Sequence, residues 1–223
     1  MQRRVPKKHA KKINKKKNRS GFTLLELLIV IAILAVLMTM VVITLNPAET
    51  LKKARDTQRI TDLSTLKTAI GLYVAETSSP VMGTATTIYL SAPTATPITG
   101  VPSDVSFIAY HQPTSVNMRN IDASGWIPIH FDTMSIGSPI SSLPVDPTNT
   151  TSAVPTDSDL CYRYVTDSSN NFELAAVFES VYYKTTINLA GTDGGVLNTA
   201  PNLVYEVGSK FIVTDATNGF AGH

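Results

Sequence analysis

The longest apolar stretch of the chain lies near its beginning. Residues 22–45 read FTLLELLIVIAILAVLMTMVVITL, a run of 24 residues with a single charge at Glu26. A helix needs about 20 apolar residues to cross the hydrocarbon core of a bilayer. At about 1.5 Å per residue the run reaches roughly 36 Å as a helix. The pattern therefore predicts a membrane-spanning helix over residues 22–45.

A second helix is predicted directly after the first. Asn46-Pro47 ends the apolar run, and these residues favour a break, because Asn caps helices and Pro suits the first helical position. Apolar residues then recur at steps of mostly three or four up to residue 76, as in an amphipathic helix. The periodicity places the charged residues of this segment on a solvated face. They are Lys52, Lys53, Arg55, Asp56, Arg59, Asp62 and Lys67.

The remainder of the chain has the pattern of a β-rich domain. Residues 77–103 are rich in Ser, Thr, Pro and Ala, which predicts a long surface loop. Short β-like runs separated by turn residues follow. An antiparallel sheet against the second helix would bury their apolar faces, so the expected fold class is α+β. The strand candidates are Val105–Tyr110, Trp126–Phe131, Leu160–Val165, Phe172–Val177 and Lys210–Val213.

Charge is distributed unevenly along the chain. The formal net charge is +2, yet residues 1–21 carry ten Lys or Arg and no acid, so the rest has a net charge of −8. Such an acidic remainder lacks the basic footprint of a nucleic-acid-binding protein. By the positive-inside rule the ten cations stay in the cytoplasm, and the residues after 45 lie outside. We interpret the basic segment as a topology signal.

Three kinds of N-terminal segment fit an apolar run behind a basic one. A secretory signal peptide has a shorter apolar core followed by a small-residue cleavage site, and neither is present here. A plain signal anchor fits the length and the charge but does not account for Glu26. A carboxylate inside a membrane segment costs on the order of 2.5–3.5 kcal/mol, which marks it as a functional residue. The third kind is one that uses Glu26.

The string GFTLLELLIV, from Gly21 to Val30, resembles the cleavage and methylation signature of type IV prepilins and the related pseudopilins. The resemblance implies that a prepilin peptidase and methyltransferase cuts between Gly21 and Phe22 and methylates the new N-terminus at Phe22. The mature chain would have 202 residues. It also implies a long N-terminal helix packed on a sheet, and self-assembly into a helical polymer by a pilus or secretion machinery.

The chemistry of this segment supports an assembly role for Glu26. Cleavage creates an ammonium at Phe22, one helical turn before Glu26, and glycine ahead of the bond leaves the backbone open to approach. Charges inside an apolar bundle need partners. In a staggered bundle the Glu26 carboxylate of one copy meets the Phe22 ammonium of the next. The alternative, in which Glu26 pairs only with its own N-terminus or with lipid headgroups, stays open.

A second and less specific resemblance lies further along the chain. LPVDP at Leu143–Pro147, CYRY at Cys161–Tyr164 and FELAAVFES at Phe172–Ser180 are similar to the C-terminal half of many bacterial pilin-like proteins. Those proteins carry a Pro-x-Asp-Pro turn, an aromatic strand and a following strand.

Signatures of catalysis or metal binding are missing from the sequence. The four His are scattered without metal-ligand spacing, and no hydrolase elbow, Walker loop or dinucleotide fingerprint is present, so we expect no enzyme and no cofactor. The single Cys161 is expected to be a small buried apolar side chain. Calcium is the one ligand considered, because some type II secretion pseudopilins bind it in a C-terminal loop. The hard oxygen donors are Asp157, Asp159, Asp167, Asp193 and Asp215.

The sequence thus predicts a membrane-anchored precursor that becomes a cell-surface filament subunit, with itself, the assembly machinery and the membrane as partners. A structural subunit of a type IV pilus is the first expectation. A pseudopilin of a type II secretion system is the second, and a membrane-anchored enzyme or binding module with a pilin-like N-terminus is the third. The predicted segments are the leader 1–21, the membrane helix 22–45, the amphipathic helix 46–76, the loop 77–103 and the β-rich domain 104–223.

Overall fold

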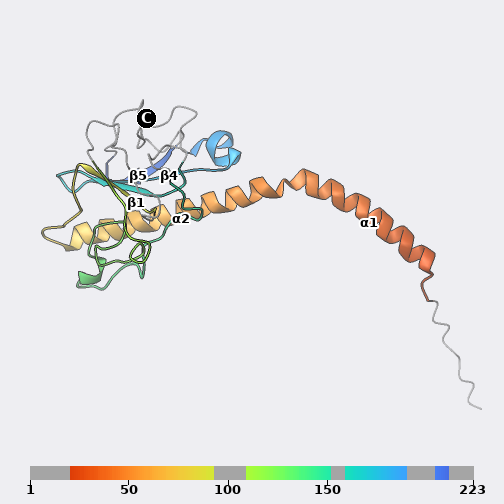
Figure 1. Ribbon diagram of the computed structural model, residues 1–223, viewed down its shortest axis with the longest axis horizontal. Helices are drawn as coiled ribbons and strands as arrows, with labels where there is room; N and C mark the ends of the chain where they lie inside the picture. The colour runs from red at the N-terminus through yellow and green to blue at the C-terminus, as the bar shows by residue number, and fades with distance from the viewer. Residues whose placement is uncertain (1–20, 93–108, 152–158, 190–203, 211–223) are drawn as a thin grey trace, which may run out of the picture. The chain divides into compact units, whose positions relative to one another are not determined.

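The computed structural model describes residues 21–92, 109–151, 159–189 and 204–210. The leader up to residue 20 lies outside the described residues, as do parts of two predicted strands, 105–108 and 211–213. The chain forms two compact units, Met1–Asn46 and Pro47–His223. Each unit holds one of the two long helices (Figure 1).

Helix α1, Leu24–Leu45, makes up the described part of the first unit together with the residues that flank it. Its apolar side chains point in every direction, and all of those described are exposed. A helix that is apolar all round needs an apolar environment on every side. Among the described residues, its stretch Leu24–Val42 is the one helical segment long and apolar enough to cross a membrane. The helix ends at Asn46, whose left-handed backbone (φ 39°) is a conformation that Asn tolerates.

Helix α2, Pro47–Glu76, begins one residue after the break, and its bounds coincide with the amphipathic helix predicted from the periodicity. Its second half packs on the sheet in the core of the second unit, where Leu63, Leu66, Ile70 and Tyr73 are buried. These positions recur at steps of three or four, so one face of the helix enters the core.

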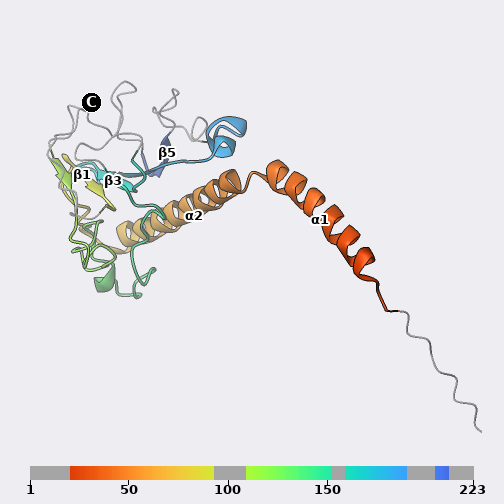
Figure 2. The same ribbon diagram turned by 45° about the vertical axis from the view of Figure 1, so that its right-hand side comes forward.

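Five strands form one sheet in the order β2-β1-β3-β4-β5. Their bounds are Thr87–Leu90 for β1, Ala109–His111 for β2, Arg163–Thr166 for β3, Phe172–Val177 for β4 and Val204–Gly208 for β5. The predicted α+β class, a long N-terminal helix followed by a sheet, is confirmed (Figure 2). The sheet is not purely antiparallel, however, because β1 and β2 pair in parallel while the other three pairs are antiparallel.

The strands differ from the prediction at several places. β4 has the predicted bounds, β3 begins at Arg163 rather than at residue 160, and β5 precedes the predicted Lys210–Val213. The predicted loop 77–103 is wrong at β1, whose Ile88, Tyr89 and Leu90 are buried in the sheet. Four residues of β-type sequence, TIYL, were hidden in a stretch whose composition is otherwise that of a loop.

Trp126–Phe131 is not a strand, although it lies in the core. Trp126, Ile127, Ile129 and Phe131 are all fully buried. Their backbone is irregular: Phe131 N donates to Ile121 O at 2.9 Å, and the described pairing here is one isolated bridge between Asp122 and His130. The Trp126 indole N–H donates to Pro144 O at 2.8 Å. The apolar composition of this segment therefore predicted its burial correctly. It did not predict the backbone, because the segment is buried without the hydrogen-bond pattern of a β-strand. A 3₁₀ turn, η1, follows at Phe131–Thr133.

Cys161 lies buried beside the sheet as a free thiol, and the expected apolar role is confirmed. Burial raises the pKa of the Cys161 thiol to about 11, which keeps it protonated and unreactive at neutral pH. One further element, the helical turn η2 at Tyr182–Thr186, follows β4 and packs against α2.

Candidate assembly site

The start of α1 is closed by a reciprocal pair of hydrogen bonds between Thr23 and Glu26. The Thr23 hydroxyl accepts from the Glu26 backbone N–H at 3.2 Å. The Glu26 carboxylate accepts, through Oε2, from the Thr23 backbone N–H at 2.9 Å and from the Thr23 hydroxyl at 3.0 Å. This capping box satisfies orphan donors of the first helical turn. It also holds the carboxylate at the tip of the helix.

The bond between Gly21 and Phe22 lies in non-helical backbone just ahead of this cap. Apart from its neighbours in the chain, no described residue has a heavy atom within 4 Å of the position that a Cβ on Gly21 would take, and Phe22 is 85% exposed. Both residues are thus open to approach. The structure brings Gly21, Phe22 and Glu26 together at one end of α1, while their roles in cleavage, methylation and assembly stay predictions.

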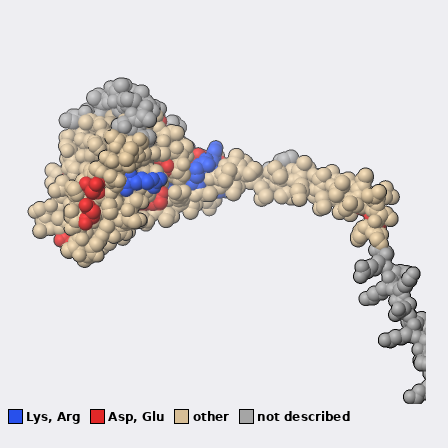
Figure 3. All heavy atoms as spheres, turned by 60° about the horizontal axis from the view of Figure 1, so that its bottom comes forward, with Lys and Arg blue, Asp and Glu red and all other residues tan. Residues whose placement is uncertain are grey.

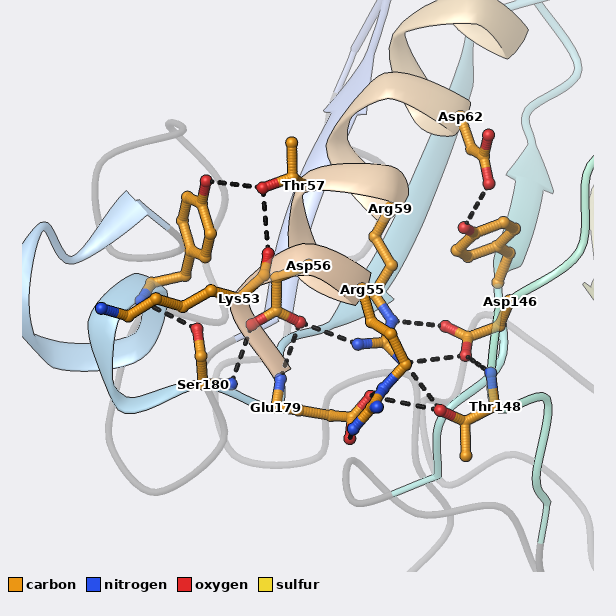
Figure 4. A network of polar contacts seen from close by, with 12 residues as sticks. Lys53, Arg55, Asp56, Thr57, Arg59, Asp62, Asp146, Thr148, Glu179 and Ser180 are labelled. Atoms are coloured by element: carbon orange, nitrogen blue, oxygen red, sulfur yellow. Dashed lines mark hydrogen bonds and ion pairs between the residues drawn. The ribbon is translucent and has the colours of Figure 1, made fainter. Parts of the chain in front are cut away.

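A second polar constellation lies at the start of α2, where sequence periodicity had placed a solvated charged face. That prediction is wrong for Asp56 and Arg59, which are completely buried. The Arg59 guanidinium donates to both oxygens of Asp146, at 2.6 and 2.8 Å, and to Asp56 Oδ1 at 2.8 Å. Figure 4 shows Arg59 between these two carboxylates.

Glu179 joins this cluster from the segment after β4. Its carboxylate receives two hydrogen bonds from Arg55, at 2.8 and 2.6 Å, and lies 2.7 Å from the Arg59 guanidinium. The hydrogen bonds from Arg55, and then from Arg59, lower the pKa of Glu179 to about 2. Burial would lower the pKa of Arg59, but hydrogen bonds and charges from Asp146, Glu179 and Asp56 outweigh it and raise that pKa.

The cluster fastens two distant segments to the first turns of α2. Asp56 accepts from the backbone N–H groups of Glu179 and Ser180, at 2.9 and 2.8 Å. Asp146 accepts from the backbone of Thr148 and Asn149, which shapes the Asp-Pro turn. Buried charges of this kind are tolerated when each is paired and hydrogen-bonded. The arrangement fixes the loop before β3 and the segment after β4 to α2.

The sequence signals identified only half of this cluster. Asp146 and Glu179 stand in two segments that resemble pilin-like proteins, but nothing in the sequence connected them with Arg59. Arg59 and Asp146 are 87 positions apart, and Arg55 and Glu179 are 124 apart. A helical pattern reports only neighbours three or four residues away, so it cannot reveal partners at that separation.

The calcium candidates do not come together in the described part of the chain. Asp159 is buried, and Asp167 holds a turn by accepting from the backbone N–H groups of Ser169 and Asn171 at 2.8 and 2.9 Å. No group of three or more His, Cys, Asp or Glu suited to a metal ion lies among the residues that the structure describes. Asp157, Asp193 and Asp215 lie outside them.

Comparison with known proteins bears on the first of these two regions. No curated protein and no solved structure matches the chain. The prokaryotic N-terminal methylation motif matches residues 16–42, a range that includes Gly21, Phe22 and Glu26. This motif is the signature of type IV pilins and pseudopilins. Residues 16–42 thus carry the N-terminal signature of type IV pilin-like and pseudopilin precursors, which supports a precursor of this kind.

Proposed function

We propose that the processed chain is a structural subunit of a type IV pilus, which polymerises through α1. The observation that carries the proposal is the position of Glu26. It is the one charge in residues 22–45 and stands in the first turn of a helix whose described side chains are all exposed. A membrane or a bundle of like helices has to cover that surface.

Processing prepares the helix for this role. A prepilin peptidase hydrolyses the Gly21–Phe22 bond, which leaves a carboxylate on Gly21 and an amine on Phe22. The amine nitrogen then takes a methyl group from a sulfonium methyl donor: the donor's S–CH₃ bond breaks, a thioether leaves, and the nitrogen loses a proton. The ten cations of the leader depart with it. The mature chain begins one residue before the Thr23 cap, so its positive end and the Glu26 carboxylate lie at the same tip of the helix.

Assembly gives both charges a partner. The cap occupies Oε2 of Glu26, and Oε1 accepts no hydrogen bond from the described residues. The Phe22 ammonium of a neighbouring copy, placed about 4 Å away at an effective dielectric constant near 20, would attract the carboxylate by about 4 kcal/mol before desolvation. The pair would fix the stagger between helices, while burial of apolar side chains supplies most of the affinity.

Substitution of Glu26 tests the proposal directly. Glu26→Val should insert into the membrane and lose its leader normally, yet give at least tenfold less sheared filament by electron microscopy. Thr39→Val is the matched control, because the Thr39 hydroxyl already donates within its own helix, to Val36 O at 2.7 Å. It should assemble like the wild type. Filament yield from Glu26→Val equal to that of the wild type would refute the pairing role.

Electron microscopy of the wild type also separates a pilus from a secretion pseudopilus. Long fibres in material sheared from the cell surface support the pilus subunit. Absence of surface fibres, together with loss of protein secretion when the chain is deleted, would assign it instead to a secretion system.

A further inference from the structure

The first turns of α2 and the η2 turn together present a basic and apolar surface. At the start of η2, Val181 is 60% exposed and Tyr182 is 36% exposed. Lys53 of α2 lies over the Tyr182 ring, Lys52 precedes it on α2, and Lys184 follows on η2. We call this surface the shoulder patch, and its members are Lys52, Lys53, Val181, Tyr182 and Lys184.

Contacts between the two elements hold the shoulder patch in shape. The Lys53 ammonium lies 4.5 Å from the centre of the Tyr182 ring, within cation–π range. The Tyr182 backbone N–H donates to Glu49 at 3.3 Å, and the hydroxyls of Tyr183 and Thr57 lie 3.1 Å apart. Asp56 anchors the start of the same segment through Ser180 (Figure 4). The patch is therefore a fixed surface of the second unit.

Two lysines of the shoulder patch, Lys52 and Lys53, follow the end of α1 closely along the chain. The 22 residues of α1 span about 33 Å, close to the thickness of a hydrocarbon core. Only Asn46 separates α1 from α2, so Lys52 and Lys53 lie within about 12 Å of the end of the membrane helix along the chain. The headgroup layer is roughly 5–7 Å thick on each side, and long lysine stems reach further.

The charge of the shoulder patch contrasts with that of the mature chain. Residues 22–223 carry a net charge of −8, yet Lys52, Lys53 and Lys184, three of their nine basic residues, lie in this patch. Figure 3 shows basic side chains over the first turns of α2. Lysines beside an exposed Tyr and Val are a composition that favours the interface of an anionic membrane, where aromatic rings lie among headgroups and lysines pair with lipid phosphates.

We propose that the shoulder patch docks on the headgroups of anionic lipids in the outer leaflet and holds the second unit against the membrane before assembly. The proposal rests on the anchoring of α1 in a bilayer and not on the filament. Docking limits the orientations of the second unit relative to the membrane until the subunit is assembled. Extraction of the subunit from the membrane then has to break these contacts.

Spin labels on the full-length chain in lipid nanodiscs test the docking. A nitroxide at Thr185→Cys reports on η2 without removing a patch residue, and the native Cys161 is buried and stays unlabelled. The matched label is Ile136→Cys, which is also exposed and lies at the other end of α2, where Ile136 N donates to Glu76 at 3.2 Å. Accessibility to oxygen and to a water-soluble nickel complex distinguishes a lipid from an aqueous environment.

In a bilayer that contains phosphatidylglycerol the label at 185 should become lipid-like, and the label at 136 should stay aqueous. High salt or pure phosphatidylcholine should reverse the change. Lys52→Gln and Lys53→Gln should each lower the ratio of docked to undocked protein about fivefold. Arg at both positions should preserve docking, and Lys67→Gln, an exposed lysine of α2 outside the patch, should have no effect.

Two results would overturn the proposal. One is a label at 185 that stays as aqueous as the label at 136 in the anionic bilayer, or responds equally to Lys52→Gln and Lys67→Gln. The other is shielding of residue 185 only within filaments and independent of lipid charge, which would make the patch an interface between copies. Because the nanodisc holds single subunits, failure of filament assembly would leave this result unchanged.

Discussion

The charged groups at the tip of α1 and those in the first half of α2 differ in burial and in pairing. At α1 one carboxylate stands at the end of a helix whose described side chains are all exposed, held by its own Thr23. At α2 a buried guanidinium is surrounded by three carboxylates from the same chain. The Arg59 cluster is therefore satisfied within the second unit, whereas among the residues that the structure describes α1 has neither an apolar environment nor a cationic partner. We infer from this difference that the α2 cluster stabilises the fold of the second unit, whereas α1 is available for assembly with other copies.

Replacement of the central cation should give the largest effect. Arg59→Met leaves Asp56, Asp146 and Glu179 buried or nearly so without their common partner, and we expect a loss of about 3–5 kcal/mol in the free energy of unfolding of the second unit. Urea unfolding followed by the fluorescence of the buried Trp126 measures it. Insertion of α1 should be unaffected.

Arg55→Met is the matched control for this substitution. The Arg55 side chain is 35% exposed and pairs only with Glu179 among the described acids, so its loss should destabilise the second unit far less than the loss of Arg59. If Arg59→Met were no more damaging than Arg55→Met, the cluster would not be what holds the distant segments to α2.

The two regions also differ in how far sequence alone predicts them. The apolar run, the break at Asn46 and the bounds of α2 follow from local patterns, because hydrophobic periodicity and caps act within one or two helical turns. The same locality made the tip of α1 predictable, since Gly21, Phe22 and Glu26 lie in one short motif. Burial of Arg59 was not predictable, because its partners Asp146 and Glu179 are reached only through the tertiary fold.

Acid should weaken the α2 region and leave the α1 helix intact. The pKa of Glu179 in the folded chain, about 2, lies below its ordinary value of 4.5. A depressed carboxyl pKa contributes stability above the ordinary value, and this contribution disappears as the pH falls from 4.5 towards 2. With allowance for partial exposure of the Glu179–Arg55 pair, we expect a loss of about 2 kcal/mol.

Glu179→Gln separates the contribution of the Glu179 carboxylate to the pH dependence of stability from the contributions of the other acidic residues. Unfolding titrations of both proteins across that pH range should show a difference in stability that narrows as the solution becomes more acidic. A difference that stays constant down to pH 2 would mean that the contacts of Glu179 with Arg55 and Arg59 do not stabilise the fold.

The smallest expected effect lies at the cap of α1. Thr23→Val removes the hydroxyl that accepts from the Glu26 N–H and should cost about 1 kcal/mol in the first helical turn. Amide hydrogen exchange in detergent micelles should show faster exchange at Glu26, with α2 unchanged. Thr23→Ser, which keeps the hydroxyl, should restore the protection. Equal protection in Thr23→Val and the wild type would show that the capping box does not hold the tip.

Strand prediction shows the same dependence on local signals. β4 was predictable as a compact apolar run, whereas β1 was hidden by the Ser, Thr and Pro around it. The segment that begins at Trp126 gave the opposite error, a predicted strand that does not form. Its side chains are buried, but its backbone is hydrogen-bonded to the loop residues Ile121 and Met118 rather than to a strand. Hydrophobicity predicts which residues are buried, but a ladder also requires partners at the right register.

Mass spectrometry of the N-terminus of filaments sheared from cells tests the central claim most directly. The account predicts a 202-residue chain that begins with N-methylated Phe22, together with filaments that disappear when Glu26 is replaced by Val. Filament subunits that retain Met1, or that begin at any residue other than Phe22, would contradict it.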